Sequence, residues 1–270
     1  MNYFFLPQIH SLRSTLTLAN FPPTEKNLWE PKTAYIHAAF SNGHEWAVQF
    51  VKQIKPGEST SVEIKDLMRV PDSNRSVFFF MYPKRLPEKL DQLPTDDYME
   101  SEPSWRGNIQ LSSETTSVSF QGEYPGFMLK PSKGKLLTFN PLIQNQIGIV
   151  TQLIVIVLLQ IAEIKTGRLI VARQISGKIE KEFQIATNTC NVLELNELQE
   201  DYDDPLCLYS PDMIGIPLFF SHDSSYRFLS LEHSYPLNEV TVFGDNARRH
   251  GFLKKIKSHW IEFLEKNVST

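Results

Sequence analysis

One long apolar run, IGIVTQLIVIVLLQIAEI (Ile147–Ile164), dominates the pattern of apolar and polar positions along the chain. Its 18 residues include no lysine or arginine, and this length is sufficient for a membrane-spanning helix. Two features favour a β-strand instead. Ten of the 18 positions are Ile, Val or Thr, whose branched side chains suit a pleated strand, and Gln152, Gln160 and Glu163 are costly in hydrocarbon. We therefore predict a strand buried on both faces, the second covered by another module of the chain or by a second chain.

The residues after this run predict a turn. The tripeptide KTG (Lys165–Gly167) is followed by RLIVARQI, a second strand-like segment. A strand, a glycine-containing turn and another strand are the elements of a β-hairpin. We therefore expect the two apolar segments to pair with each other.

Short strand-like segments recur through both halves of the chain, bounded by Gly, Pro, Asn and Ser. Four pairs of similar segments follow one another in the same order. They are AYIHAAFSNGHEWAVQFVKQI with LIVIVLLQIAEIKTGRLIVARQI, VEIKDL with LELNEL, SVFFFMYP with PLCLYSP, and NIQLSSETTSVSFQGEYP with PLFFSHDSSYRFLSLEHSYP. The shared order indicates two copies of one β module, and the alternative is a chance similarity among short strands. The fold class that we predict is mostly β: two tandem antiparallel β-sandwich modules, Ig-like or jelly-roll-like, followed by a helix.

The domain boundaries follow from changes in composition. We place one module at residues 1–130, a second at 131–245, and a C-terminal helix at 246–270, with the linker near Pro131–Gly134. Residues 83–104 have no counterpart in the second half. Their four prolines and six carboxylates predict an exposed excursion rather than core, either a functional loop or a solvated spacer.

The C-terminal segment has a helical period. Its apolar residues fall on one face: Phe252, Leu253, Ile256, Trp260, Phe263 and Leu264. Lysines and arginines lie away from that face, and such a helix either docks on the preceding domain or lies on an anionic membrane. We favour docking, because short helices gain most of their stability from tertiary packing.

Composition narrows the classes of partner and the compartment. Lys and Arg number 27 against 31 Asp and Glu, a net charge of −4, which argues against a protein that binds duplex nucleic acid. The two cysteines, Cys190 and Cys207, lie in apolar surroundings that favour buried thiols over a disulfide. The first residues lack the pattern of a secretory signal, so we expect a cytoplasmic protein without a transmembrane segment.

Common catalytic and cofactor motifs do not occur in the sequence. It has no phosphate-binding glycine loop, no G-x-S-x-G elbow and no zinc-ligand spacing, so we predict neither a cofactor nor a metal. The acidic run Glu197–Asp204 lacks the glycine and the distal glutamate of a calcium loop. A solvated loop is the better interpretation of this run.

The candidate site comes from polar residues near the last strands of each half, with a Trp-Arg pair after the insertion. Its members are Trp105, Arg106, Glu123, His222, Asp223 and Glu232. Trp105 would stack on a sugar-like ring, and Arg106 and the carboxylates would bind hydroxyls. The alternative is that the carboxylates bind nearby backbone groups and that Trp105 fills core. Glu232 and its neighbour His233 must point to opposite faces of a strand.

These patterns favour a non-catalytic binding or scaffolding protein that recognises a small molecule, a glycan or a protein. Two alternatives stay open. One is an enzyme, or an accessory protein of polysaccharide biosynthesis, that acts through a Glu/His/Asp pocket. The other is a peripheral membrane protein that binds through the basic C-terminal helix. The run Ile147–Ile164 would then form either an interface between the modules or a homo-oligomer contact.

Overall fold

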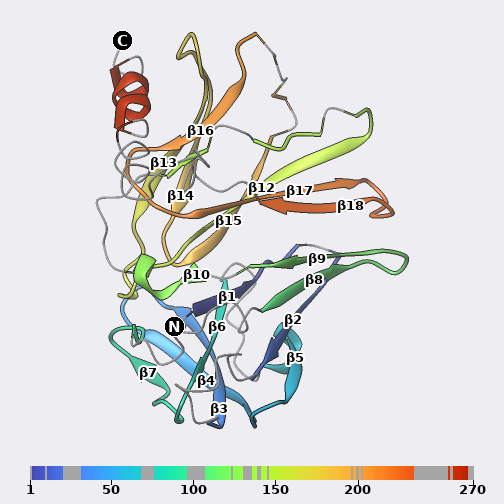
Figure 1. Ribbon diagram of the computed structural model, residues 1–270, viewed down its shortest axis with the longest axis vertical. Helices are drawn as coiled ribbons and strands as arrows, with labels where there is room; N and C mark the ends of the chain where they lie inside the picture. Colours follow the sequence, from blue (N-terminus) through green and yellow to red (C-terminus); the bar gives the residue numbers. More distant parts are fainter. Residues whose placement is uncertain are drawn as a thin grey trace, which may run out of the picture.

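The computed structural model describes residues 2–9, 11–20, 32–67, 76–95, 107–122, 124–129, 136–138, 141–144, 146–195, 197–198, 201, 203–233, 255 and 258–266. These residues are mostly β-strand and form four antiparallel sheets, with a helix near the C-terminus (Figure 1). The predicted fold class is confirmed at this level, whereas the Ig-like or jelly-roll-like topology stays a prediction.

The N-terminal half contributes two sheets. The first has the order β10-β1-β6-β3-β4-β7 and the second the order β5-β2-β8-β9. Their strands are β1 (Asn2–Leu6), β2 (Arg13–Ala19), β3 (Ala34–Ser41), β4 (Trp46–Ile54), β5 (Ser59–Glu63), β6 (Val77–Tyr82), β7 (Lys89–Leu90), β8 (Asn108–Ser112), β9 (Ser117–Gln121) and β10 (Tyr124–Pro125). Two 3-10 turns, η1 (Ile64–Asp66) and η2 (Gly126–Leu129), follow β5 and β10. β3 and β4 form a hairpin, and Asn42 and Gly43 lie in its turn, where Gly43 takes a positive φ of 93°.

The C-terminal half contributes the other two sheets. Their orders are β11-β16-β13-β14 and β15-β12-β17-β18. The strands are β11 (Leu136–Thr138), β12 (Ile149–Val157), β13 (Thr166–Arg173), β14 (Ile179–Ala186), β15 (Thr189–Glu194), β16 (Leu206–Ser210), β17 (Ile216–Asp223) and β18 (Leu229–His233). Apolar residues from both sheets meet in one core, including Leu153, Leu169, Leu208 and Phe219.

The two halves share one strand order. The order β11-β16-β13-β14 corresponds to β1-β6-β3-β4, and β15-β12-β17-β18 corresponds to β5-β2-β8-β9. Three of the four sequence pairs fall on corresponding strands: β5 with β15, β6 with β16, and the hairpin β8–β9 with β17–β18. The remaining pair was wrong by one strand, because the counterpart of the β3–β4 hairpin is β13–β14 and not β12–β13.

Within the apolar run, β12 (Ile149–Val157) is buried on both faces over residues 153–157, whereas Ile147 and Ile164 lie outside the strand and are exposed. Leu153, Val155 and Val157 belong to the core of the C-terminal half. Ile154 and Ile156 point the other way and join the main core, which the N-terminal strands supply in large part. The N-terminal half therefore covers the second face of β12 (Figure 1). Within the described ranges, no helix has the length and apolar character that a membrane crossing requires.

The predicted hairpin between the two apolar segments was wrong. β12 pairs with β15 and β17, whereas β13 pairs with β14 and β16 in a different sheet. The connecting residues run against the N-terminal half instead of forming a tight turn. The Gln160 carbonyl accepts hydrogen bonds from Trp46 Nε1 at 2.8 Å and from Leu93 N at 2.8 Å, and Gln160 N donates to the Leu129 carbonyl at 3.0 Å. These hydrogen bonds hold the connection between β12 and β13 against the N-terminal half, so the two strands do not pair with each other.

The first part of the insertion is attached to the body and is not a free excursion. Leu93 is fully buried, and Leu86 and Leu90 pack against the main core. Leu86 N donates to His37 Nε2 at 3.1 Å, and the Arg85 guanidinium lies 3.9 Å from the centre of the Phe50 ring. Residues 83–95 thus lie along the N-terminal sheet as a strap held by leucines, and residues 96–104 are outside the described ranges.

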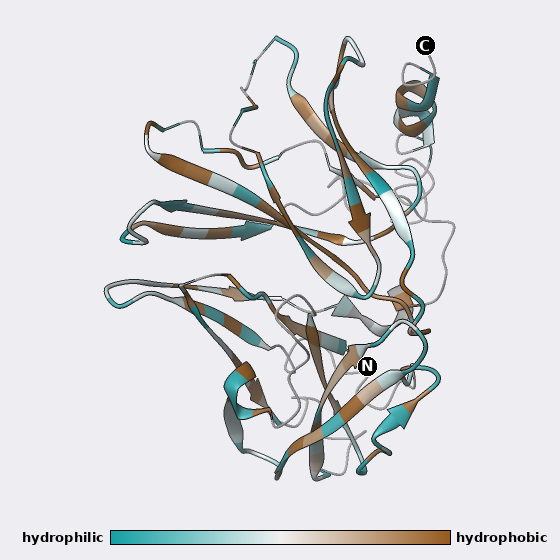
Figure 2. Ribbon diagram, turned by 180° about the vertical axis from the view of Figure 1, so that it is seen from behind, coloured by the Kyte–Doolittle hydropathy of each residue, from teal (hydrophilic) through white to brown (hydrophobic). Residues whose placement is uncertain are grey.

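The C-terminal helix docks on the protein. Residues 258–266 are helical, and Leu264 is fully buried in a cluster with Ile170, Cys207 and Tyr209. Figure 2 shows the apolar side of this helix turned toward the sheets and the polar side turned away. Burial, together with the nearby Glu265 carboxylate, raises the pKa of the Tyr209 hydroxyl. This packing agrees with the docking interpretation that the apolar period favoured.

Candidate functional site

The sheet separates the predicted site residues that the structure describes. His222 and Phe220 lie on one face of β17, with their rings stacked at 5.2 Å. Glu232 pairs with Phe219 across β17 and β18, so its side chain lies on the opposite face. Asp223, next to His222, also points away from it. Trp105, Arg106 and Glu123 lie outside the described residues, so their part in the predicted pocket stays a prediction.

Asp223 closes the turn between β17 and β18. Its carboxylate accepts hydrogen bonds from Phe228 N at 2.9 Å, Arg227 N at 2.7 Å and Ser225 Oγ at 2.5 Å. The Phe228 amide above all, with the Ser225 hydroxyl, lowers the pKa of Asp223 to about 2. Such a carboxylate stays ionised, and its three hydrogen bonds hold the turn. Its part in a ligand site stays a prediction.

The corresponding turn in the first half is closed in the same way. Ser113 Oγ accepts hydrogen bonds from Thr116 N at 3.1 Å and Thr115 N at 3.3 Å. The same hydroxyl donates to the Tyr226 carbonyl of the other half at 2.9 Å. The similar segments SSETT and SHDSS therefore form two turns, each closed by a side-chain oxygen that accepts backbone N–H groups.

His222 belongs to the contact between the halves. It is 7% exposed, and its ring stacks on Tyr226 at 4.6 Å as well as on Phe220. Its Nδ1 atom lies 2.9 Å from the Asp223 carbonyl oxygen. Its Nε2 atom is buried and has no hydrogen-bond partner, so this side of the ring is held by packing. Its part in a ligand site stays a prediction.

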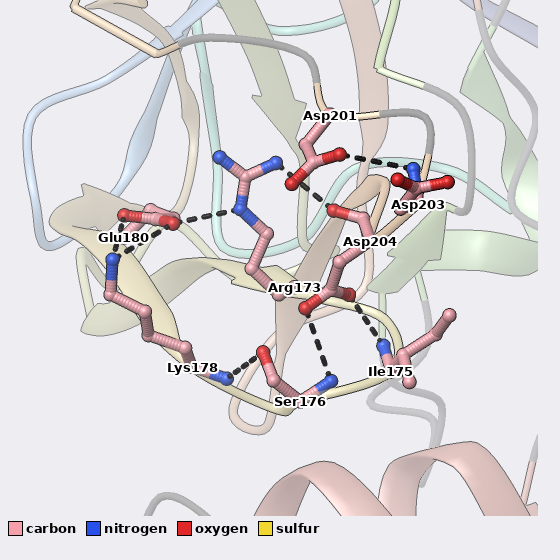
Figure 3. Close-up of polar contacts among 8 residues, drawn as sticks. All are labelled: Arg173, Ile175, Ser176, Lys178, Glu180, Asp201, Asp203 and Asp204. Atoms are coloured by element: carbon pink, nitrogen blue, oxygen red, sulfur yellow. Dashed lines mark hydrogen bonds and ion pairs between the residues drawn. The ribbon is translucent and has the colours of Figure 1, made fainter.

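Asp204, the last residue of the acidic run, binds Arg173 and a neighbouring turn (Figure 3). Arg173 Nε donates to Glu180 Oε1 at 2.7 Å, and Arg173 Nη1 donates to the Asp204 carbonyl at 3.0 Å. The Asp204 carboxylate accepts from Ile175 N at 2.7 Å and Ser176 N at 3.2 Å. Burial raises the pKa of Asp204, but the hydrogen bonds from Ser176 and Ile175 outweigh it and the net shift is downward. In the described part of the chain, no three His, Cys, Asp or Glu residues are grouped so as to hold a metal ion.

An open pocket of about 430 Å³ lies at one end of the N-terminal half. Two segments line it: the connection from β1 to β2, and the end of β5 with η1. The lining residues are Gln8, Ile9, Leu12, Arg13, Ser14, Glu63, Ile64 and Lys65. Its volume is within the range of small-molecule sites, but its lining has a larger share of charged and polar side chains than is usual for such sites.

One carboxylate holds two cations in this pocket. Arg13 donates to Glu63 Oε1 through both Nε, at 2.9 Å, and Nη2, and the Lys65 ammonium lies 2.9 Å from Glu63 Oε2. The hydrogen bonds from Arg13 and then from Lys65 lower the pKa of Glu63 to about 2. The Glu63 side chain is 13% exposed, whereas those of Arg13 and Lys65 are 64% and 68% exposed. The cations therefore face solvent over a shared, mostly covered anion.

Both walls of the pocket are closed turns. Leu12 N donates to the Ile9 carbonyl at 3.1 Å, and Ser14 Oγ donates to the Pro7 carbonyl at 2.6 Å. On the other wall, Glu63 N donates to Asp66 Oδ2 at 2.9 Å. Ser11 holds the first turn with a φ of 70°, a conformation that costs a non-glycine residue on the order of 1 kcal/mol and that recurs at ligand sites. The lining is preorganised, so a ligand would not have to order it.

The sequence contains no signal that could have identified this pocket. Arg13 and Glu63 are separated by 50 residues and meet only because Thr15 of β2 pairs with Glu63 of β5. No family model matches the chain, and neither the curated proteins nor the solved structures include a significant match.

Proposed function

We propose that this chain is a non-catalytic binding or scaffolding protein that holds a small anionic molecule in the pocket at Arg13, Glu63 and Lys65. The observation that carries the proposal is the pair of exposed cations fixed by one carboxylate. Arg13 uses Nε and Nη2 for Glu63, which leaves Nη1 for a ligand, and the Lys65 ammonium has further N–H donors. An anion can bridge the two cations without displacing Glu63.

The charges in this pocket favour binding over acid–base catalysis. The hydrogen bonds to Glu63 lower the pKa of this carboxyl to about 2. The hydrogen bond and ion pair with Glu63 in turn raise the pKa of Arg13. A general acid or base needs a pKa near the working pH, and neither group meets that requirement. The carbohydrate-active alternative rests on Glu123, His222 and Glu232, of which the structure places two on opposite faces of a sheet.

Thermal unfolding tests the proposal directly. A panel of acetate, phosphate and N-acetylleucine should include at least one anion that raises the unfolding midpoint of the wild type by about 2–4 °C, the shift that corresponds to roughly 1 kcal/mol in a chain of this size. Arg13→Gln and Lys65→Gln should each abolish the increase. Arg168→Gln is the matched control, because Arg168 forms a comparable exposed ion pair with Asp212 in the other half.

Two results would overturn the proposal. One is an absence of any shift across the panel in the wild type. The other is a shift that Arg13→Gln and Lys65→Gln retain to the same extent as Arg168→Gln, because binding would then occur elsewhere on the protein.

A further inference from the structure

We infer that the ligand of this pocket is a monocarboxylate with a short aliphatic arm, an inference that rests on the proposed function. The class corresponds chemically to an N-blocked aliphatic amino acid or to the C-terminal residue of a peptide. Three properties of the pocket define it: its charge balance, the geometry of its free donors, and its apolar lining.

The charge balance favours one negative charge over two. Arg13 and Lys65 contribute two positive charges, and Glu63 offsets one of them at contact distance. Asp66 lies close enough to reduce the remaining positive charge. Its side chain accepts a hydrogen bond from Glu63 N, and its carboxylate attracts the Arg13 guanidinium. Arg13, Lys65 and Glu63, the charged residues that line the pocket, carry one net positive charge, which a monoanion balances. A dianion would exceed this charge and would meet repulsion from Glu63 and from the nearby Asp66.

The free donors suit a planar carboxylate. The Arg13 guanidinium is held in plane by its two bonds to Glu63 Oε1, so the direction of its remaining Nη1 donors is fixed. The Lys65 ammonium is held beside the other oxygen of Glu63. A carboxylate has two oxygens, and each can accept from one cation. Charge-assisted hydrogen bonds of this type are shorter and stronger than neutral ones.

The apolar lining supplies a place for the arm. Ile9, Leu12 and Ile64 line the pocket together with the cations. Leu12 and Ile64 are only partly buried, although both pack against the main core. An aliphatic group that covers them removes apolar surface from water on both partners. A bare anion leaves this surface exposed.

Titration calorimetry with four probes separates these properties. The probes are N-acetylleucine, which has both the charge and the arm, acetate, which lacks the arm, N-acetylleucinamide, which lacks the charge, and inorganic phosphate, which is largely dianionic at pH 8. We expect N-acetylleucine to bind about tenfold more tightly than acetate, which corresponds to burial of roughly two CH₂ groups. We expect phosphate to bind more weakly than N-acetylleucine, and the amide to show no binding.

Substitution of an apolar lining residue tests whether the aliphatic arm of the ligand contacts that lining. Leu12→Ser should reduce N-acetylleucine affinity to that of acetate while acetate affinity itself stays constant, which also shows that the variant is folded. Ile64→Ser repeats the test from the other wall and decides it if Leu12→Ser unfolds. Arg13→Gln should weaken both carboxylates.

The failures of the two proposals are distinguishable. Equal affinity for N-acetylleucine and acetate, or tighter binding of phosphate through Arg13, overturns the ligand class and leaves the anion pocket intact. Binding of the amide as tightly as of the acid also overturns the ligand class. If none of the charged probes binds, the proposed function itself is wrong.

Discussion

Leu153 and Ile154 are neighbours in β12, yet their side chains lie in two different cores. Leu153 packs between the sheets of the C-terminal half, and Ile154 packs into the main core that the N-terminal strands largely supply. Because alternate residues of a strand point to opposite faces, one segment joins the two halves. Residues 153–157 are therefore apolar without interruption and lack the polar alternation of a strand that has one face in water.

This arrangement predicts a large cost for Ile154→Ala. The substitution removes a fully buried side chain from the contact between the halves, and we expect the free energy of unfolding to fall by about 2–4 kcal/mol. Val192 is the matched control, because it pairs with Ile154 on β15 and is 42% exposed. Val192→Ala should change stability by less than about 0.5 kcal/mol. Urea unfolding measures both, and equal effects would show that this face of β12 is not covered.

His37 predicts a dependence of stability on pH. Burial lowers the pKa of His37 to about 4 from its ordinary 6.5; a backbone hydrogen bond with Tyr35 acts in the opposite direction, and the Arg85 charge also lowers it. The unfolded chain binds a proton below pH 6.5, whereas the folded protein does not until about pH 4. Stability should therefore decrease as pH falls from 6.5 to 4, by about 3 kcal/mol at most.

His37→Gln isolates this contribution. The glutamine keeps an acceptor for the Leu86 N–H group but does not titrate. Urea unfolding at pH 7.0, 5.5 and 4.5 should show a smaller loss of stability in the variant than in the wild type. Parallel curves for the two proteins would exclude His37 as the source of the slope.

The packing of the C-terminal helix leads to a third prediction. Leu264→Ala should reduce stability by about 2–4 kcal/mol, because Leu264 is fully buried against Ile170 and Tyr209. Glu262→Ala, an exposed position of the same helix, is the control and should have little effect.

The intact protein should stay in the supernatant when anionic vesicles are sedimented. Co-sedimentation that Leu264→Ala abolishes would instead support a membrane role for this face.

The local signals in the sequence predicted individual strands well. β-Branched residues identified β12, and three of the four pairs of similar segments fall on corresponding strands. The pairing of β12 was not predictable in the same way. Its partners β15 and β17 begin at Thr189 and Ile216, and the hydrogen bonds of Gln160 to the N-terminal half decide where the next segment goes. Such contacts have no signature in a window of neighbouring residues.

The insertion, residues 83–104, also has contacts that the local sequence did not predict. Its prolines and carboxylates predicted an exposed loop, and most of residues 84–92 are indeed exposed. Leu86, Leu90 and Leu93 nevertheless attach it to the sheet, since the two or three residues between successive leucines allow each to reach the body from an irregular backbone. Composition averaged over the segment conceals these contacts.

The candidate site was the part least accessible from sequence. Polar residues at strand ends indicated a cluster, but Asp223 and Ser113 close turns, and the sheet separates His222 from Glu232. The pocket in the N-terminal half depends on the register that pairs Thr15 with Glu63. Arginine and lysine are common surface residues, so the sequence alone does not show that Arg13 and Lys65 line a pocket. Only that register brings them together.

Backbone and side-chain NMR during a titration with N-acetylleucine tests the location of the site most directly. We predict that the largest chemical-shift changes occur at the Arg13 Nε–H group and at the amides of Leu12, Ser14, Ile64 and Lys65. Changes centred on His222 and Asp223 in the turn between β17 and β18, with none at Arg13, would contradict the assignment of the binding site to the N-terminal pocket.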